Sequence, residues 1–388
     1  MADILARRGR WAVAAMFFAN GFLTGSWAPQ IPVFLTRLEI SESTLGLLIL
    51  VFGLGALAAM PWCGWLIHRY GSRAVLRLFA VFCSFALLAV ALAGNLLAAT
   101  VTMFLFGGLI GGMDVAMNAN AVAVEGRLRR AIMSSSHGFW SLGGFAGGGM
   151  GGIAIQQYGH VTHAAVVTAL TVIVVAVALK HVVAEDVQPL AHKAPYALPR
   201  SAAVYLTGVI ALFSMIPEGA VLDWAALYLQ QELGSDIAVA GFAFAAFSAT
   251  MALMRFLGDG VRNRFGAVTT LRVSSLVAAA GMFGAGFAPN AWVAIASFAL
   301  SGIGIANMVP IAFSAAGNHH GVVAGAGLST VTLMGYSGIL VAPSAIGFIG
   351  ERTNFAPVFV ALSLLLVTVF LMAGNARVAD FRVAQPAE

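Results

Sequence analysis

Three acidic residues lie within stretches of the chain that are otherwise almost free of charge. Asp114 lies in the apolar segment 97–124, and Glu218 and Asp223 lie in the apolar segment 202–230. An ionisable residue inside a bilayer costs free energy, so its retention there usually indicates a function. A carboxyl in a low-dielectric environment can bind and release a proton, because its charged form is disfavoured. We therefore predict proton coupling or solute binding at Asp114, Glu218 and Asp223.

The spacing of polar residues around Asp114 indicates a polar stripe along one helix. Asp114, Asn118 and Glu125 fall within about 40° of one helix face. Such a stripe is typical of the wall of a water-filled pathway. A buried hydrogen-bonded cluster that holds the helix to its neighbours is the alternative. For Glu125, which is close to Arg127, an interfacial ion pair is the favoured interpretation.

The other two carboxyls cannot face the same point, because five residues of helix place Glu218 and Asp223 about 140° apart. Pro217 removes a backbone hydrogen bond just before Glu218, so we expect a bend and an unpaired carbonyl near this carboxyl. Asp223 lies nearer the outer end of the segment. There, a gating or structural hydrogen bond is an equal alternative to solute contact.

The segments that carry these residues are predicted to be membrane-spanning helices. Of the 388 residues, 60% are hydrophobic and only 9% are charged, whereas soluble proteins carry about 25% charged residues. A soluble globular enzyme is therefore excluded. No charged residue occurs in 273–350, which leaves room for three spans of roughly 20 residues each. The alternation typical of a membrane β-barrel is absent, so the predicted class is all-α.

Charge-free runs and weak polar breaks together predict twelve transmembrane helices. Their predicted ranges are 11–34, 44–66, 74–93, 97–124, 133–156, 162–182, 202–230, 237–259, 268–288, 290–316, 323–349 and 355–375. All Lys and Arg residues except Arg37 and Arg352 fall on one side of this arrangement, and such residues are retained in the cytoplasm during insertion. Both termini are therefore predicted to be cytoplasmic, with the protein in the cytoplasmic (inner) membrane. The net charge of +5 reflects this bias, so no nucleic-acid partner is expected.

The chain contains an internal repeat. His68-Arg69-Tyr70-Gly71 aligns with Asn263-Arg264-Phe265-Gly266 about half the chain length later. Many transporters are built from two related halves. We predict an N-terminal six-helix bundle at 1–182, a cytoplasmic linker at 183–201 and a C-terminal six-helix bundle at 202–388. This arrangement needs no second chain, so a monomer is expected.

The first copy of the repeat carries a recognisable motif. The segment Gly64-Trp65-Leu66-Ile67-His68-Arg69-Tyr70-Gly71-Ser72-Arg73 resembles the signature G-x-x-x-D-R-x-G-R-R of the major facilitator superfamily. The chain resembles this superfamily over its whole length, which implies a transporter with a central site that opens alternately to each side. His68 replaces the acidic residue of the signature. A gate closed by charge would therefore be pH-sensitive or rebuilt around Asp259, with simple capping of a helix end by His68 as the alternative.

We predict a set of gating residues at the cytoplasmic ends of the helices, and the resemblance carries over to Arg69, Gly71 and Arg73 of this set. The gating set is Gly64, His68, Arg69, Gly71, Arg73, Glu125, Arg255, Asp259 and Arg264.

Further segments are similar to the fucose permease-like group of bacterial transporters, namely Gly112–Asn118, Ser134–Trp140, Glu218–Trp224 and Ala306–Pro310. The resemblance implies a sugar-like solute and a cavity lined by the first, fourth, seventh and tenth helices. The predicted solute-binding residues are Asn20, Trp27, Gln30, Asn118, Trp224 and Asn307. The tryptophans are suited to stacking on a ring, with packing or interfacial anchoring as the alternative use.

The sequence predicts a proton-coupled secondary transporter of a small polar solute, with the solute, protons and membrane lipid as its partners. No nucleotide-binding or catalytic motif is present, and Cys63 and Cys83 lie inside predicted helices, so we expect no enzyme activity, cofactor or metal.

One alternative is a proton-linked exporter of amphipathic compounds, favoured by the 27 Phe residues and by the glycine-rich segment 143–152, which resembles an antiporter signature with Gly148 in place of proline. Tight helix packing is the simpler explanation of those glycines. The alternative of another class is a non-transporting membrane receptor or scaffold.

Overall fold

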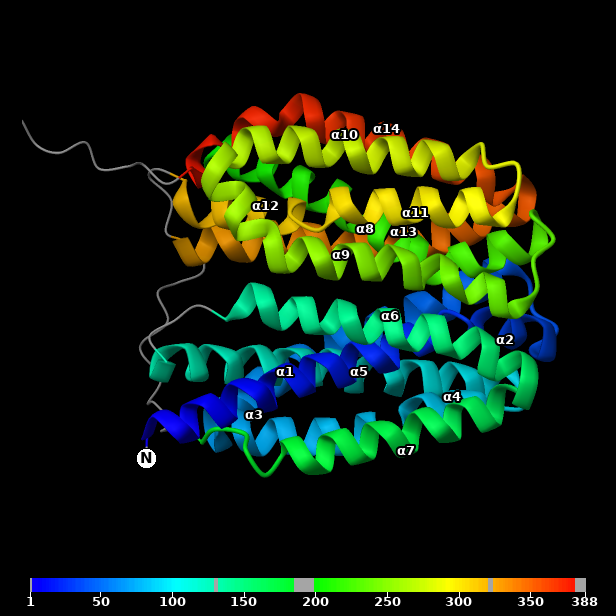
Figure 1. The fold of residues 1–388 in the computed structure, drawn as a ribbon, viewed down its shortest axis with the longest axis horizontal. Helices are drawn as coiled ribbons and strands as arrows, with labels where there is room; N and C mark the ends of the chain where they lie inside the picture. The colour runs from blue at the N-terminus through cyan, green and yellow to red at the C-terminus, as the bar shows by residue number, and fades with distance from the viewer. Residues whose placement is uncertain (1, 129–131, 185–198, 320–323, 381–388) are drawn as a thin grey trace, which may run out of the picture.

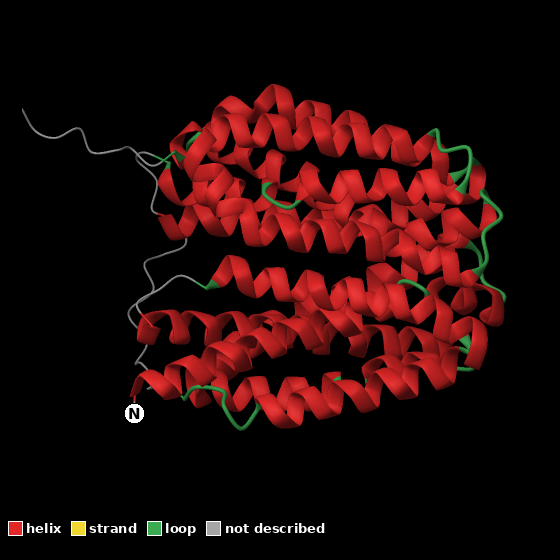
Figure 2. Ribbon diagram, in the orientation of Figure 1, coloured by secondary structure: helices red, strands yellow, loops and turns green. Residues whose placement is uncertain are grey.

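The computed structural model describes residues 2–128, 132–184, 199–319 and 324–380, and within these ranges it consists of helices without any strand (Figure 2). The elements are α1 (Ala2–Trp27), α2 (Gln30–Leu38), α3 (Glu42–Cys83), α4 (Ala86–Leu92), α5 (Leu96–Leu128), α6 (Met133–Tyr158), α7 (His160–Ala178), α8 (Ala202–Gln231), α9 (Ile237–Phe265), α10 (Ala267–Gly286), α11 (Ala291–Ile305), α12 (Met308–Asn318), α13 (Ala324–Arg352), α14 (Phe355–Met372) and the 3₁₀ helix η1 (Ala373–Ala379). Lipid offers the backbone no hydrogen-bond partner, and a helix satisfies its own backbone. The all-α prediction is confirmed.

Nine helical stretches in the described parts of the chain are long and apolar enough to cross a membrane, judged by length and composition. One of them, Glu42–Leu92, contains two of the predicted spans. Two more predicted spans, α1 and α6, fall outside the nine because α1 carries arginines and polar residues and α6 is rich in glycine and serine. Every one of the twelve predicted ranges therefore coincides with one or two helices of the structure.

The helices form two bundles (Figure 1). The N-terminal half contains α1–α7 and the C-terminal half contains α8–η1. Gly71 and Gly266, which are equivalent in the sequence repeat, adopt almost the same backbone conformation, with φ of 79° and 78° and ψ of 156° and 163°. A positive φ is accessible to glycine without a steric cost. Most of the predicted linker 183–201 lies outside the described residues.

Three predicted helices are interrupted in the structure: 74–93 is divided at Ser84–Phe85, and the other two are divided close to a proline. The predicted helix 11–34 is divided at Ala28–Pro29, and the predicted helix 290–316 is divided at Ala306–Asn307. In both of these cases a proline lies four positions beyond the first residue of the break: Pro32 after Ala28, and Pro310 after Ala306. Because proline lacks an N–H group, it cannot donate to the carbonyl four residues earlier. The Ala28 carbonyl accepts a hydrogen bond of 3.3 Å from the N–H of Ile31 instead. Asn307 at the second break keeps a right-handed helical conformation, with φ of -100° and ψ of -8°.

The two halves meet along two pairs of helices, α6 with α9 and α3 with α13. A Cβ added to Gly152 of α6 would lie 2.6 Å from the carbonyl oxygen of Ile237, and one added to Gly46 of α3 would lie 2.9 Å from that of Pro343. Small residues let helix backbones approach closely in a membrane. Gly143 of α6 makes the same kind of approach to α1. The glycines of segment 143–152 therefore serve the close packing of α6 on its neighbouring helices.

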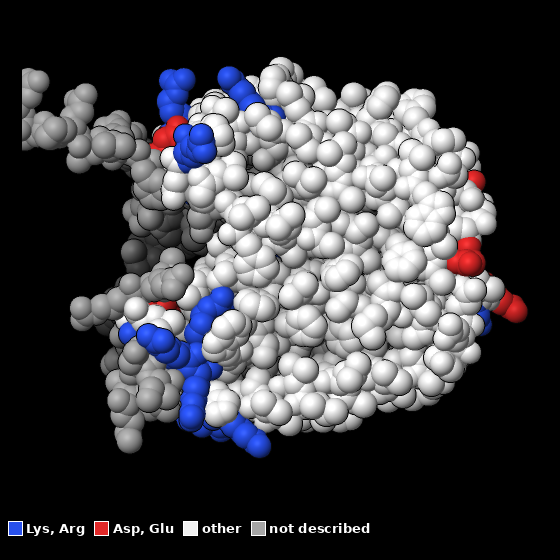
Figure 3. All heavy atoms as spheres, viewed as in Figure 1, with Lys and Arg blue, Asp and Glu red and all other residues white. Residues whose placement is uncertain are grey.

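The two ends of the molecule differ in charge. On the face shown in Figure 3, the Lys and Arg side chains gather at the end that also carries the N-terminus, which we call the basic end. In Figure 3 the surface is hollowed between the two halves at this end. The far end carries Glu42 and Glu351, each of which accepts a hydrogen bond from the opposite half of the molecule.

Candidate solute site and gate

A cavity of about 650 Å³ lies between the two halves. This volume falls within the range of small-molecule sites. Its lining runs from Ser134 and Arg262, toward the basic end, to Trp27 and Asp223, toward the far end. Aromatic rings form much of the wall, contributed by Trp27, Phe52, Phe106, Trp140, Phe244, Phe313 and Tyr336. A cavity of this kind combines apolar surface with a few polar groups that can orient a ligand.

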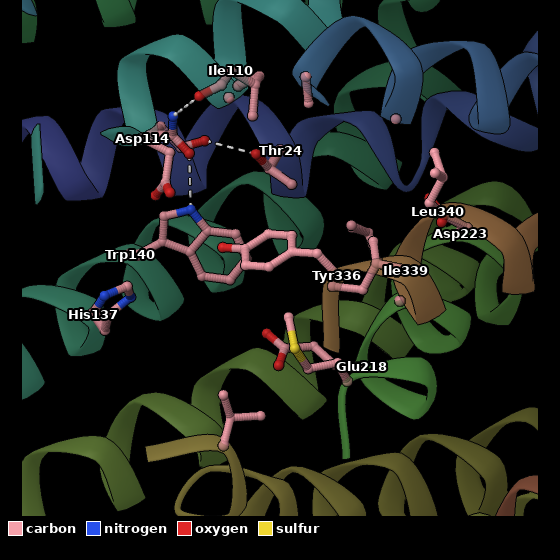
Figure 4. A pocket seen from close by; sticks show the side chains of 18 of the residues that line it. Thr24, Ile110, Asp114, His137, Trp140, Glu218, Asp223, Tyr336, Ile339 and Leu340 are labelled. Atoms are coloured by element: carbon pink, nitrogen blue, oxygen red, sulfur yellow. Dashed lines mark hydrogen bonds between the residues drawn. The ribbon is translucent and has the colours of Figure 1, made fainter. Parts of the chain in front are cut away.

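Asp114 belongs to α5 and lies on the cavity wall that the N-terminal half forms (Figure 4). Its Oδ1 accepts a hydrogen bond of 3.2 Å from Nδ2 of Asn118, and the same amide donates to the backbone carbonyl of Asp114 at 2.9 Å. No Lys or Arg in the described ranges forms an ion pair with Asp114. Asn118 itself does not line the cavity. The polar stripe predicted on this helix therefore supplies one cavity carboxyl and one residue that orients it.

Asn20 on α1 holds Trp140 of α6 in place beside Asp114. Nε1 of Trp140 donates to Oδ1 of Asn20 at 2.9 Å, and Nδ2 of Asn20 donates to the carbonyl of Ile110 at 3.2 Å (Figure 4). The Asn20 amide thus connects three helices of the N-terminal half, and the Trp140 ring is fixed at the cavity wall.

Glu218 lies on the opposite wall, on α8, and pairs with Arg255 of α9. The Nη2–Oε1 distance is 3.5 Å, and the two side chains are only 20% and 14% exposed, respectively. Nη1 of Arg255 also donates to Oγ of Ser141 in the N-terminal half at 2.6 Å, and the guanidinium lies 5.9 Å from the centre of the Trp140 ring. Arg255 therefore connects a carboxyl of one half to a hydroxyl and a ring of the other.

Asp223 occupies the far end of the cavity, separate from Glu218, as the predicted angle between them requires. Its buried carboxyl interacts with the side chain of Trp27 from the N-terminal half. Trp27 is itself packed edge-on against Phe34 and Phe106, at ring distances of 5.3 and 6.4 Å. This contact joins the two halves where the cavity approaches the far end of the molecule.

Asn307 lines the cavity at the break between α11 and α12. Its side chain is 7% exposed, and its Nδ2 has no hydrogen-bond partner among the described residues. Burying an unpaired donor costs free energy, so such a group is a candidate for a partner that is not part of the chain.

Three predicted solute-binding residues do not line the cavity: Asn118, which orients Asp114, and Gln30 and Trp224, which hold helices together. Gln30 donates to the carbonyl of His160 and hydrogen-bonds Nδ1 of His163, both at 2.9 Å. Trp224 is fully buried and stacks on Phe355 at a ring distance of 5.3 Å. Both side chains are in positions that hold helices together.

The predicted gating residues of the signature lie at the basic end, outside the cavity. Gly71 marks the turn within α3, and Arg69 stacks on Trp65 and Tyr70, with its guanidinium 5.6 and 5.5 Å from their rings. Gly64, His68 and Arg73 lie on the same helix, and Arg264 lies over Phe265 on α9. The side chain of Asp259 is outside the described residues.

Glu125 does not form the predicted ion pair with Arg127 but binds backbone N–H groups instead. Its Oε1 accepts hydrogen bonds from the backbone N–H groups of Ile132 and Met133, at 2.6 and 2.9 Å. Arg127 instead donates to the carbonyl of Ala184. Glu125 therefore ties the end of α5 to the start of α6, where a negative charge is favoured by the helix dipole.

Two cavity residues carried no signal that singled them out in the sequence. Tyr336 lies in the long charge-free region, and His137 lies in a segment noted only for its family resemblance. His137 packs edge-on against Phe17 at 5.0 Å. A polar hydroxyl in the middle of an apolar segment is the one sequence feature that could have marked Tyr336 as a cavity residue.

The sequence matches the family model of the Major Facilitator Superfamily over residues 13–216 and again over 207–382. The chain belongs to the major facilitator superfamily. An uncharacterized MFS-type transporter of Yersinia pestis is 34% identical over 355 residues, which cover 91% of this chain and 92% of the relative. Members of this superfamily are transporters, so the chain is a multi-pass membrane protein of a transporter family and its partner is a small-molecule solute.

Solved structures of other superfamily members share the fold. The nucleoside transporter NupG superposes with a TM-score of 0.76 at 12% identity, covering 95% of this chain and 99% of the other. A D-xylose-proton symporter gives 0.71 at 13% identity, covering 94% and 96%. The E. coli fucose:proton symporter FucP gives 0.61 at 17% identity, covering 95% and 98%. These matches show the major facilitator fold of two six-helix bundles, as the sequence predicted.

Proposed function

We propose that this protein is a secondary transporter that couples the movement of protons to that of a small polar, sugar-like solute. The observation that carries the proposal is a cavity between two halves with an acidic group on each wall. Asp114 has no ion-pair partner among the described residues, whereas Glu218 is paired with Arg255. Solved structures that share the fold include proton symporters of D-xylose and fucose.

Asp114 is the proposed main proton site. A carboxylate without a counter-cation is expensive to hold in a largely apolar cavity, so proton binding relieves that cost. Glu218 is the proposed second site, because a proton on its carboxyl would release Arg255 to its contacts with Ser141 and Trp140. Asp223 is the proposed third site, since its protonation would weaken the contact with Trp27.

The proposed transport cycle is alternating access, in which the two halves rock about the central site. Four hydrogen bonds join the halves at or near the far end: Ser43 N to Glu351, Gln231 to Glu42, Ala238 N to Gln156, and Ser344 to the carbonyl of Gly46. The hollow in the surface between the two halves lies at the basic end instead (Figure 3). We propose that this conformation faces the cytoplasm, with both termini cytoplasmic and the protein, as a monomer, in the inner membrane.

The apolar lining favours a second candidate function, the proton-linked export of amphipathic compounds. Phe52, Phe106, Phe244 and Phe313 all contribute to the cavity wall. Such a wall would accept hydrophobic compounds with little discrimination, as flexible apolar sites do. Substrate testing distinguishes the two functions, because only the first requires a polar solute.

Uptake into proteoliposomes tests the proposed function. We expect purified protein to accumulate radiolabelled D-xylose, fucose or uridine when an inwardly directed proton gradient is imposed, and to lose accumulation when a protonophore collapses the gradient. Asp114→Asn should retain exchange of solute across the membrane but lose the response to the gradient, because its side chain keeps its shape but cannot carry a proton.

Glu218→Gln is the second variant and Glu39→Gln, which lies outside the cavity, is the matched control. Unchanged gradient dependence in both Asp114→Asn and Glu218→Gln would contradict the proposed proton sites. Transport confined to lipophilic cations would favour the exporter, and no transport of any compound would favour a receptor.

A further inference from the structure

Tyr336 is a cavity aromatic whose side chain extends into the space between the two halves. It belongs to α13 in the C-terminal half, and in Figure 4 its ring extends from that helix toward Trp140 of the N-terminal half. Figure 4 shows the Tyr336 side chain between Asp114 on one side and Glu218 on the other. The hydroxyl therefore lies between the two acidic walls of the cavity.

The Tyr336 hydroxyl has no hydrogen-bond partner among the described residues, although the ring is only partly exposed. Two other tyrosines, Tyr205 and Tyr228, use their hydroxyls within the protein. Tyr228 donates to the carbonyl of Ala285 at 2.7 Å, and Tyr205 donates to that of Pro199 at 2.9 Å. A buried tyrosine hydroxyl usually has a partner. For Tyr336 the neighbouring space is the cavity itself.

Packing fixes the position of Tyr336 relative to Glu218. Gly335, the preceding residue, lies so close to α8 that an added Cβ would be 2.6 Å from the sulfur of Met215. Gly338 makes an equally close approach, 2.6 Å from a Leu212 methyl group. The turn of α13 that carries Tyr336 is therefore held against the same helix that carries Glu218. A hydroxyl on a rigid element discriminates between ligands better than one on a mobile side chain.

We propose that Tyr336 determines solute specificity by hydrogen bonding to a hydroxyl group of a ring-shaped solute. A phenol can both donate and accept a hydrogen bond, and the carboxyl group of Asp114 offers an acceptor oxygen whether or not it carries a proton. A solute with two neighbouring hydroxyl groups satisfies both side chains, with one hydroxyl on Tyr336 and the next on Asp114. The solute class is therefore a cyclic compound with adjacent hydroxyls, the feature common to sugars and to the ribose of nucleosides. This inference rests on the proposed transport function.

Binding to the purified full-length protein tests the inference. The probes are D-xylose, fucose and uridine, together with the monodeoxy analogues of whichever of them raises the melting temperature of the wild-type protein. Tyr336→Phe removes only the hydroxyl. We expect it to weaken binding of the parent solute about tenfold. One monodeoxy analogue should bind the wild type and Tyr336→Phe with equal affinity, because the group that Tyr336 contacts is already missing.

Two further tyrosine variants separate recognition from folding. Tyr205→Phe is the matched control and should bind every probe as the wild type does. Tyr228→Phe loses a hydrogen bond within the protein and should lower the melting temperature without ligand. Tyr336→Phe should leave that temperature unchanged, since its hydroxyl makes no such bond.

Each outcome decides between the inference and the proposed function. Equal binding of the parent solute by Tyr336→Phe and the wild type would overturn the inference and leave the transport function standing. A melting temperature that falls as much as in Tyr228→Phe would assign Tyr336 a structural role and would also overturn the inference. If no probe stabilises the wild type, the proposed sugar-like solute is wrong, and the inference falls with it.

Discussion

Gly258 of α9 is buried beside the cavity, and the space left by its missing side chain is filled by the amide of Asn307. A Cβ at Gly258 would lie 2.0 Å from Oδ1 of Asn307. Gly258→Ala should therefore turn the Asn307 amide away from its position and weaken solute binding by about tenfold, as small displacements of a polar contact do. Because only the end of a side chain must move, the free energy of unfolding should fall by about 1 kcal/mol. Isothermal titration with the transported solute measures the first effect and thermal unfolding measures the second.

The same helix offers a matched control for this prediction. Gly260 has no atom within 4 Å of an added Cβ, so Gly260→Ala should bind the solute normally and be slightly more stable than the wild type. Equal affinities for Gly258→Ala, Gly260→Ala and the wild type would show that the position of Asn307 does not matter for binding.

At the scale of helices, the contact between α6 and α9 depends on backbone approach at Gly152. An added Cβ there would lie 2.6 Å from the carbonyl oxygen of Ile237 and 2.9 Å from that of Ala238. Backbone atoms cannot move aside as a side chain can, so Gly152→Ala should lower the free energy of unfolding by about 1–3 kcal/mol. Gly149→Ala is the control, because its Cβ would make only an ordinary contact of 3.6 Å with Ala245. Thermal unfolding in detergent compares the two variants, and equal melting temperatures would argue against close packing of α6 on α9.

At the scale of the whole molecule, transport requires the closed far end to open. Ser43 and Glu351 lie there on opposite halves, joined by a hydrogen bond of 2.9 Å. A Ser43→Cys, Glu351→Cys variant treated with a short bifunctional thiol reagent should lose nearly all uptake, because the halves can no longer separate at that end. A cleavable disulfide-containing reagent should allow uptake to recover after reduction.

The native cysteines do not interfere with this experiment, since Cys63 and Cys83 are both buried. Each single-cysteine variant treated with the same reagent is the control and should transport normally. Full uptake by the cross-linked double variant would contradict alternating access by separation of the halves.

The sequence by itself determined the class of structure and its repeat. A charge content of 9% leaves helices as the way to satisfy the backbone in lipid, and the motif repeated around Gly71 and Gly266 predicted two related halves. It also placed Asp114 and Glu218 at membrane depth, because a charge in an apolar run is visible without any contact. Charge, apolar length and helical period are local properties, so they can be read from the chain alone.

Only the tertiary structure decided which polar side chains share the cavity. Asn307 and Gln30 look alike in the sequence, yet Asn307 lines the cavity and Gln30 bonds to His163. Tyr336 lines the cavity because α13, which carries it, packs against α8. The rotation of a helix about its own axis is set by neighbours far away in sequence, such as the glycines that bring α6 and α9 together. Helical period gives the angles between residues on one helix but not the direction in which that helix faces.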